Sequence, residues 1–227
     1  MASTSGLEAA KACMTFTPFS VLRVALSALV STVSTIFGVY ALSFAVNTVH
    51  LDRSTMLWVG VATNLVALAS IPLWAMLADR FGRKPVYIFG VLGSGMLMFL
   101  YLAVLSGGNY FLIFIVAILM SGIVYQAQNG IFPAFYSEMF PTRVRLSGMA
   151  IGTQIGFAIA GFAPSIAAAI AGPGISGWVP VAAMTLIACV IAAIAASTAG
   201  ETAKMTLQDI EEAADLKSNH ALTGARS

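Results

Sequence analysis

The stretch "LADRFGRKPVYIFG", residues 77–90, places four charged side chains between two long apolar runs. Asp79, Arg80, Arg83 and Lys84 lie within six residues of one another, in a chain that is 59% hydrophobic and only 9% charged. Soluble globular chains carry about 45–50% apolar residues. The excess indicates a membrane protein, and the four charges then mark a turn outside the hydrocarbon.

Outward from this turn, six apolar runs are long enough to cross a bilayer, since a spanning helix needs about 20 apolar residues. Helix is expected throughout, because lipid offers no partner to an open strand edge. The runs cover about 24–46, 56–78, 86–105, 110–136, 147–171 and 178–198. We therefore predict an all-α integral membrane fold of six transmembrane helices, joined by short connections that hold no soluble domain.

The predicted organisation has three parts: an N-terminal segment over 1–20, a six-helix bundle over 21–199 and a C-terminal tail over 200–227. Within the tail, 206–216 is expected to form a short amphipathic helix with Thr206 as its N-cap. Three prolines inside the runs are expected to kink their helices: Pro72, Pro133 and Pro164.

Lysine and arginine are distributed very unevenly between the two sides of the predicted bundle. Arg53 stands alone on one side, and ten basic residues gather on the other: Lys11, Arg23, Arg80, Arg83, Lys84, Arg143, Arg145, Lys204, Lys217 and Arg226. Because cytoplasmic loops carry the excess of basic residues, we expect a multi-pass plasma-membrane protein with both termini in the cytoplasm. A net charge of only +2 gives no sign of a nucleic-acid partner.

Two connections on the basic side combine an acid with two arginines, and we call them the first charged loop (79–85) and the second charged loop (137–146). In the first, Asp79, Arg80 and Arg83 stand at fixed offsets from Gly82 and Pro85. The simplest interpretation is positive-inside anchoring. The ordered pattern is more specific than anchoring requires. The second charged loop repeats the combination with three residues, Glu138, Arg143 and Arg145.

These motifs carry a resemblance to a known family. "ADRFGRKP" resembles the cytoplasmic signature loop of the major facilitator superfamily, in its second-half copy. "AFYSEMFPTRVRLSG" is similar to the loop between helices ten and eleven in the metabolite:proton symporter branch, and "AIGTQIGFAIAGFAPSIAAAI" to its helix eleven. The resemblance covers about 20–205. It implies that the chain is equivalent to helices 7–12, the C-terminal half of a twelve-helix fold.

The resemblance also implies roles for the charged residues. Asp79, Arg80, Gly82 and Arg83 would form a gating latch on the cytoplasmic side. Its counterpart in the second charged loop would be Glu138, Arg143 and Arg145. The implied activity is proton-coupled symport of a small organic acid or zwitterion, such as shikimate, a dicarboxylate or betaine, with no cofactor and no metal.

Polar side chains inside the runs are candidates for a substrate pathway. In hydrocarbon an amide must find a partner, so each is also a candidate for hydrogen bonding between helices. Gln126, Asn129 and Pro133 share one helical face by their spacing. The other pathway candidates are Tyr40, Asn64 and Gln154.

A second group of candidates concerns helix packing. Gly148, Gly152 and Gly156 recur every four residues. Such a stripe of small residues lets two helix backbones approach closely, so we expect it to face another span. The two cysteines, Cys13 and Cys189, show no metal or redox spacing and are expected to be inert thiols.

Two functions remain open at this point. The first is half of a secondary transporter working by alternating access, which needs a second six-helix half as a separate chain or as a second copy of itself. The alternative is a truncated, non-transporting membrane protein or an assembly subunit. The lack of any Asp, Glu, Lys, Arg or His deep within a run favours this alternative, because ion-coupled carriers usually keep such a group at membrane depth. An enzyme is not expected, since no base or ligand cluster is present there.

Overall fold

The structure, a computed structural model, describes residues 18–140 and 144–199. In these residues it contains helices and no strand. Six helical spans are long and apolar enough to cross a membrane, and we number them 1 to 6 in chain order: Pro18–Asn47, Arg53–Phe81, Arg83–Ser106, Tyr110–Ser137, Arg145–Ile170 and Val179–Ser197. The predicted all-α fold with six spans is confirmed. The amphipathic helix expected over 206–216 and residue Cys13 lie outside the described residues.

Three spans are single helices: α5 (Arg53–Phe81), α6 (Arg83–Ser106) and α12 (Val179–Ser197). The other three are composite. Span 1 joins α2 (Pro18–Ser27), the 3₁₀ turn η1 (Ala28–Ser31), α3 (Thr32–Thr35), the π-helical η2 (Ile36–Tyr40) and α4 (Ala41–Asn47). Span 4 joins α7 (Tyr110–Ala117), the π-helical η3 (Ile118–Val124), α8 (Gln126–Asn129) and α9 (Phe132–Ser137). Span 5 joins α10 (Arg145–Gly161) and α11 (Ala163–Ile170).

The prolines act differently in the three spans that contain them. Pro133 and Pro164 each lie in the first turn of a new helical segment, α9 and α11, where the missing N–H leaves no bond unmade. Pro72 lies inside α5, which continues through it without interruption. Two of the three prolines, Pro133 and Pro164, therefore coincide with a break in the helix. Pro72 does not, because a proline within an apolar span is tolerated.

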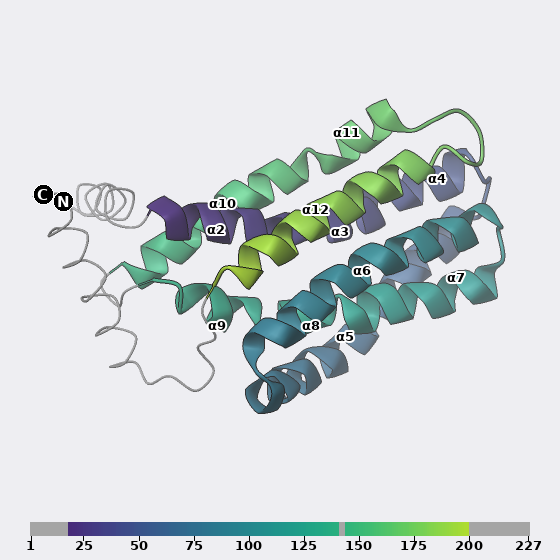
Figure 1. The fold of residues 1–227 in the computed structure, drawn as a ribbon. Helices are drawn as coiled ribbons and strands as arrows, with labels where there is room; N and C mark the ends of the chain where they lie inside the picture. Colours follow the sequence, from purple (N-terminus) through teal and green to yellow (C-terminus); the bar gives the residue numbers. More distant parts are fainter. Residues whose placement is uncertain (1–17, 141–143, 200–227) are drawn as a thin grey trace, which may run out of the picture.

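The spans lie side by side in an order different from that of the chain (Figure 1). Span 5 packs on span 1, span 1 on span 6, span 6 on span 3, span 3 on span 4, and span 4 on span 2. Helix α2 begins and α12 ends at the same end of the bundle, the end that also holds α9 and the turn between α5 and α6 (Figure 1). Both charged loops therefore come to one end.

The first charged loop is shorter in the structure than the sequence suggests. Residues 79–85 are expected as a connection, but α5 continues to Phe81 and α6 begins at Arg83, so only Gly82 is non-helical. Gly82 has φ 101°, a conformation that a side chain would strain. The glycine thus reverses the chain within one residue, and the flanking charges are carried on helical turns.

The glycine stripe of α10 faces α2. A Cβ added at Gly156 would lie 2.4 Å from the Ala25 carbonyl oxygen, and one at Gly152 would lie 2.8 Å from the Val24 side chain. Gly148 instead faces the Phe140 ring, which would lie 2.5 Å from an added Cβ. Two of the three glycines therefore set the contact between spans 5 and 1, and the third makes room for an aromatic ring.

Candidate functional site

The two charged loops meet through Arg83. One of its guanidinium nitrogens pairs with the Glu138 carboxylate, and the other lies 3.7 Å from Asp79 Oδ1. The side chains of Arg83 and Glu138 are 23% and 15% exposed, whereas that of Asp79 is 71% exposed. The pair between the loops is therefore the sheltered one, and the contact within the first charged loop lies in water.

The remaining charged candidates do not join this cluster by any ion pair within the described residues. Arg80 is exposed and its guanidinium carbon lies 5.8 Å from the centre of the Phe81 ring. Arg145 donates from Nε to the Phe140 carbonyl at 3.5 Å, and its Nη2 is buried without a hydrogen bond. Arg143 lies outside the described residues.

A pair of buried tyrosines joins spans 3 and 4, the two spans that the Arg83–Glu138 pair also joins. The Tyr87 and Tyr136 hydroxyl oxygens lie 2.6 Å apart, and the Tyr87 hydroxyl also bonds the Ser27 carbonyl of span 1 at 3.0 Å. Both rings are buried. Sequence reasoning missed this pair, although a tyrosine in an apolar run signals a hydroxyl that needs a partner.

Three amide side chains of span 4 form a hydrogen-bonded set, which we call the amide cluster: Gln126, Gln128 and Asn129. Gln128 donates to Asn129, Asn129 donates to Gln126, and Gln126 donates to the Ser121 carbonyl, at 2.9, 2.9 and 2.7 Å. The two glutamines are buried, and Asn129 is partly exposed. The hydrogen bonds stay within span 4, so the amides are satisfied without crossing to another span.

The predicted face through Gln126, Asn129 and Pro133 is only partly present. Gln126 and Asn129 bond each other. The helix is then interrupted at Gly130 and Ile131, and α9 begins at Phe132 with Pro133 in its first turn, so helical spacing no longer carries the face onward.

The wide turn η3 explains where the amide cluster finds its acceptor. In this segment the Tyr125 N–H bonds the Met120 carbonyl, five residues back. Other carbonyls of the turn accept from side chains: Ser121 from Gln126, and Ile123 from Trp74 of span 2 at 2.9 Å. Wide π turns are frequent at functional sites, and this one supports the cluster.

The other three pathway candidates lie apart from the amide cluster, and no hydrogen bond among the described residues links them to it. Tyr40 is buried and stacks on Phe44, with ring centres 6.1 Å apart. Asn64 is exposed and donates to the Gly60 carbonyl of its own helix at 2.9 Å. Gln154 is exposed on α10.

Six helices that could cross a membrane, with two charged turns joined at one end and an amide cluster inside one span, define a multi-pass helical membrane protein. The family model described as Major Facilitator Superfamily matches residues 24–219. The chain belongs to this family, as the charged loops predicted.

The chain is similar to transporters that are named by what they carry. It is 32% identical to the shikimate transporter of Escherichia coli (strain K12) over 158 residues, which are 69% of this chain and 36% of that protein. It is 27% identical to the proline/betaine transporter of the same strain over 190 residues, 80% of this chain and 37% of that protein. The citrate-proton symporter of Klebsiella pneumoniae is 29% identical over 147 residues, 63% of this chain and 32% of that protein.

These relatives support the predicted metabolite:proton symporter branch. The matched part of the chain spans about a third of the length of these curated relatives. No solved structure gives a significant match.

Proposed function

We propose that this chain is the C-terminal half of a proton-coupled symporter for a small organic acid or zwitterion. The half works by alternating access against a second six-helix half, supplied as a separate chain or as a second copy. The protein lies in the plasma membrane with both chain ends in the cytoplasm.

The observation that carries this proposal is the Arg83–Glu138 pair. Residues 55 apart in sequence, from two motifs typical of the superfamily, are brought together at one end of the bundle. Transport by rocking bundles needs an end that opens and closes. The sheltered pair joins spans 3 and 4 and leaves Asp79, at 71% exposure, and the exposed Arg80 as charges available to a second half.

The amide cluster is the proposed contribution to the substrate pathway. Its donors and acceptors are neutral, which suits the hydroxyl, carboxylate or quaternary ammonium groups of a small polar metabolite. Asn129 is the partly exposed member of the cluster and thus the one that a substrate would reach. The relatives named for shikimate, proline/betaine and citrate support this substrate class.

The test is uptake of labelled shikimate, citrate and betaine by cells expressing this chain alone, and by cells that also express a first-half bundle. We expect uptake that a proton ionophore abolishes, and only when both halves are present. Robust uptake by the chain alone as a monomer would overturn the half-transporter proposal, whereas uptake by a dimer of the chain would identify the second copy as the other half. Absence of uptake with any first half, when both chains are in the membrane, would favour the non-transporting alternative.

Two substitutions in the assembled transporter test the role of the first charged loop and the role of the amide cluster separately. Asp79→Asn should lower the maximal rate, with Arg53→Gln at the opposite end as the control. Asn129→Ala should raise KM, with Asn64→Ala as the matched control, because Asn64 is exposed and bonded to its own helix. If Asp79→Asn transports normally, the first charged loop is only an anchor.

A further inference from the structure

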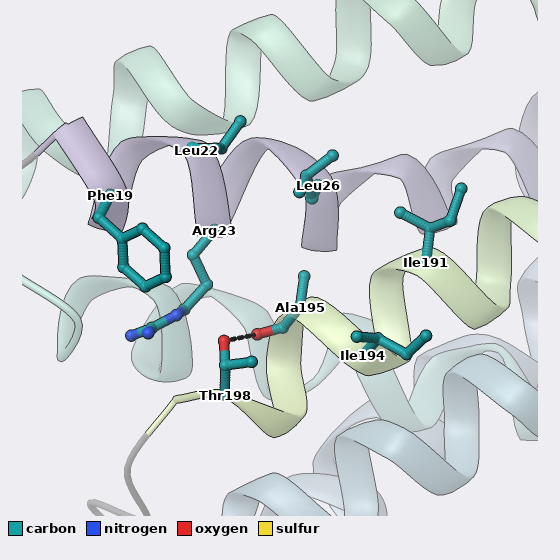
Figure 2. Close-up of a pocket in the computed structure, with 8 residues that line it drawn as sticks. All are labelled: Phe19, Leu22, Arg23, Leu26, Ile191, Ile194, Ala195 and Thr198. Atoms are coloured by element: carbon teal, nitrogen blue, oxygen red, sulfur yellow. Dashed lines mark hydrogen bonds between the residues drawn. The ribbon is translucent and has the colours of Figure 1, made fainter.

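A groove between span 1 and span 6 is lined by none of the residues of the amide cluster or of the Arg83–Glu138 pair. It has a volume of about 250 Å³, below the roughly 300–1,000 Å³ of most small-molecule sites. It is lined by Phe19, Leu22, Arg23 and Leu26 of span 1 and by Ile191, Ile194, Ala195 and Thr198 of span 6. Figure 2 shows Phe19 and Arg23 extending from α2 toward the end of α12 that carries Ala195 and Thr198.

One cation lies in this apolar groove without a counter-charge. Arg23 Nε is buried and has no hydrogen bond, and the guanidinium carbon lies 4.8 Å from the centre of the Phe19 ring. The acids in the described residues are Asp52, Asp79 and Glu138, and no ion pair joins any of them to Arg23. A buried guanidinium donor without an acceptor is costly, and within residues 18–140 and 144–199 no acid supplies an anion to the groove.

The other polar group in the groove does not supply that anion. The Thr198 hydroxyl donates to the Ala195 carbonyl of its own helix at 2.7 Å, as Figure 2 shows. One residue further, the Lys84 ammonium donates to the Ala199 carbonyl at 2.9 Å. Two cationic side chains therefore lie near this end of α12.

The groove changes from polar to apolar along the helix axis. Arg23 and Thr198 lie toward the membrane surface at which span 1 begins and span 6 ends, whereas Leu26 and Ile191 lie deeper. A phospholipid has the same order, with its phosphate at the surface and its acyl chains toward the bilayer centre. Leu22 and Ile194 are more than half exposed, so the groove opens outward to a chain lying along it.

We propose that this groove binds one anionic phospholipid, with the phosphate on Arg23 and an acyl chain along Leu22, Leu26, Ile191 and Ile194. A guanidinium matches phosphate geometry with two parallel hydrogen bonds. The phosphate neutralises the charge of Arg23 at the accessible part of its guanidinium, and the acyl chain covers the apolar walls.

The first experiment is native mass spectrometry of the purified full chain titrated with phosphatidylglycerol. Arg23→Gln should weaken binding of the first lipid about five-fold, the share of one basic residue near an anionic membrane surface. Arg53→Gln is the matched control and should leave this binding unchanged. Phosphatidylcholine should bind more weakly than phosphatidylglycerol, and glycerol phosphate without acyl chains should not bind. Equal losses in the two variants, or equal binding of headgroup and lipid, would overturn the proposal.

The second experiment uses the unaltered chain, so it does not depend on a variant folding. Phosphatidylglycerol with a photoreactive group in its acyl chain is activated in vesicles, and the cross-linked peptides are mapped. We expect cross-links at Leu22, Leu26, Ile191 or Ile194. Cross-links spread evenly over the exposed faces of α5 and α10 would show non-specific contact, and a groove protected by a second copy of the chain would show a different occupant.

Discussion

Arg83 is the residue on which the charged end of the bundle depends. It holds Glu138 in a sheltered pair across the two charged loops and contacts Asp79, four residues earlier on the other side of the Gly82 reversal, in water. The two acids therefore differ in their environment although the sequence presents them alike, as one acid in each loop. Removing the Glu138 carboxylate leaves the sheltered Arg83 guanidinium without its main partner. Removing the Asp79 carboxylate breaks only an exposed contact, whose groups water can hydrate.

We predict that Glu138→Gln lowers the free energy of unfolding by about 1.5–3 kcal/mol, the usual contribution of a hydrogen bond to a charged group. Unfolding by SDS in mixed micelles, followed by tryptophan fluorescence, measures this change. Asp79→Asn is the matched control and should cost less than about 1 kcal/mol, as exposed ion pairs do. Equal losses for the two variants would contradict the sheltered position of Glu138.

Asp52 gives a prediction about pH. Its carboxylate caps α5 by accepting from the Thr55 N–H at 2.7 Å and the Thr55 hydroxyl at 2.8 Å. These bonds lower the pKa of Asp52 from its ordinary value of 3.8. Because the folded pKa is the lower one, the cap's contribution to stability is complete above the unfolded pKa and is lost as the pH falls through the folded pKa.

The measurement compares the chain with Asp52→Asn, which keeps a capping oxygen and cannot titrate. The difference in unfolding free energy between the two proteins should be constant from pH 7 to about pH 5 and should shift against the unaltered chain below about pH 4. A difference that stays the same down to pH 3 would show that the cap does not titrate with folding.

At the scale of elements, the six spans were predictable because each is long and apolar, and lipid permits only helix. Their internal irregularities were not. The length of an apolar run does not predict the π turns η2 and η3, nor that residues 79–81 are helical. They depend on partners from other spans, such as Trp74 for a carbonyl of η3, or on Gly82 reversing the chain alone. The helical face predicted through Gln126, Asn129 and Pro133 is interrupted at Gly130 and Ile131, which apolar run length does not reveal either.

The close contact of α10 with α2 gives the element-scale prediction. Gly156→Ala places a Cβ 2.4 Å from the Ala25 carbonyl oxygen, a backbone atom that cannot rotate away. We expect a loss of about 1–3 kcal/mol, typical of overpacking, in the same SDS titration. Gly60→Ala in α5, where an added Cβ meets nothing within 4 Å, is the control and should be neutral or stabilising. Tolerance of alanine at both sites would mean that the helices can separate freely.

For the whole molecule, the family and the number of spans followed from two short motifs and the composition. The order in which the spans pack side by side could not be predicted, because the loops do not indicate which apolar helix faces contact one another. The buried tyrosine pair and the unpaired Arg23 also required the assembled bundle, since each depends on neighbours far away in the chain. Orientation remains a prediction from the basic residues.

We expect a fluorescent protein fused after Ser227 to fluoresce in the cytoplasm. Alkaline phosphatase inserted after Gly174, in the connection between α11 and α12, should be active on the opposite side of the membrane. An insertion after Gly82 should be inactive, as the control for a cytoplasmic position. The reverse pattern would contradict the orientation.

The π turn in span 4 has a mechanical consequence. A π turn holds one residue more than the α-helical turn it replaces, so its return to regular α-helix would rotate everything beyond it by about 100° about the span axis. Such a rotation would carry Gln126 and Asn129 to another side of the span and withdraw the carbonyls that now serve Gln126 and Trp74. Those two hydrogen bonds would therefore oppose a rotation of span 4, and the free energy needed to break them would set how readily the amide cluster could change the direction it faces.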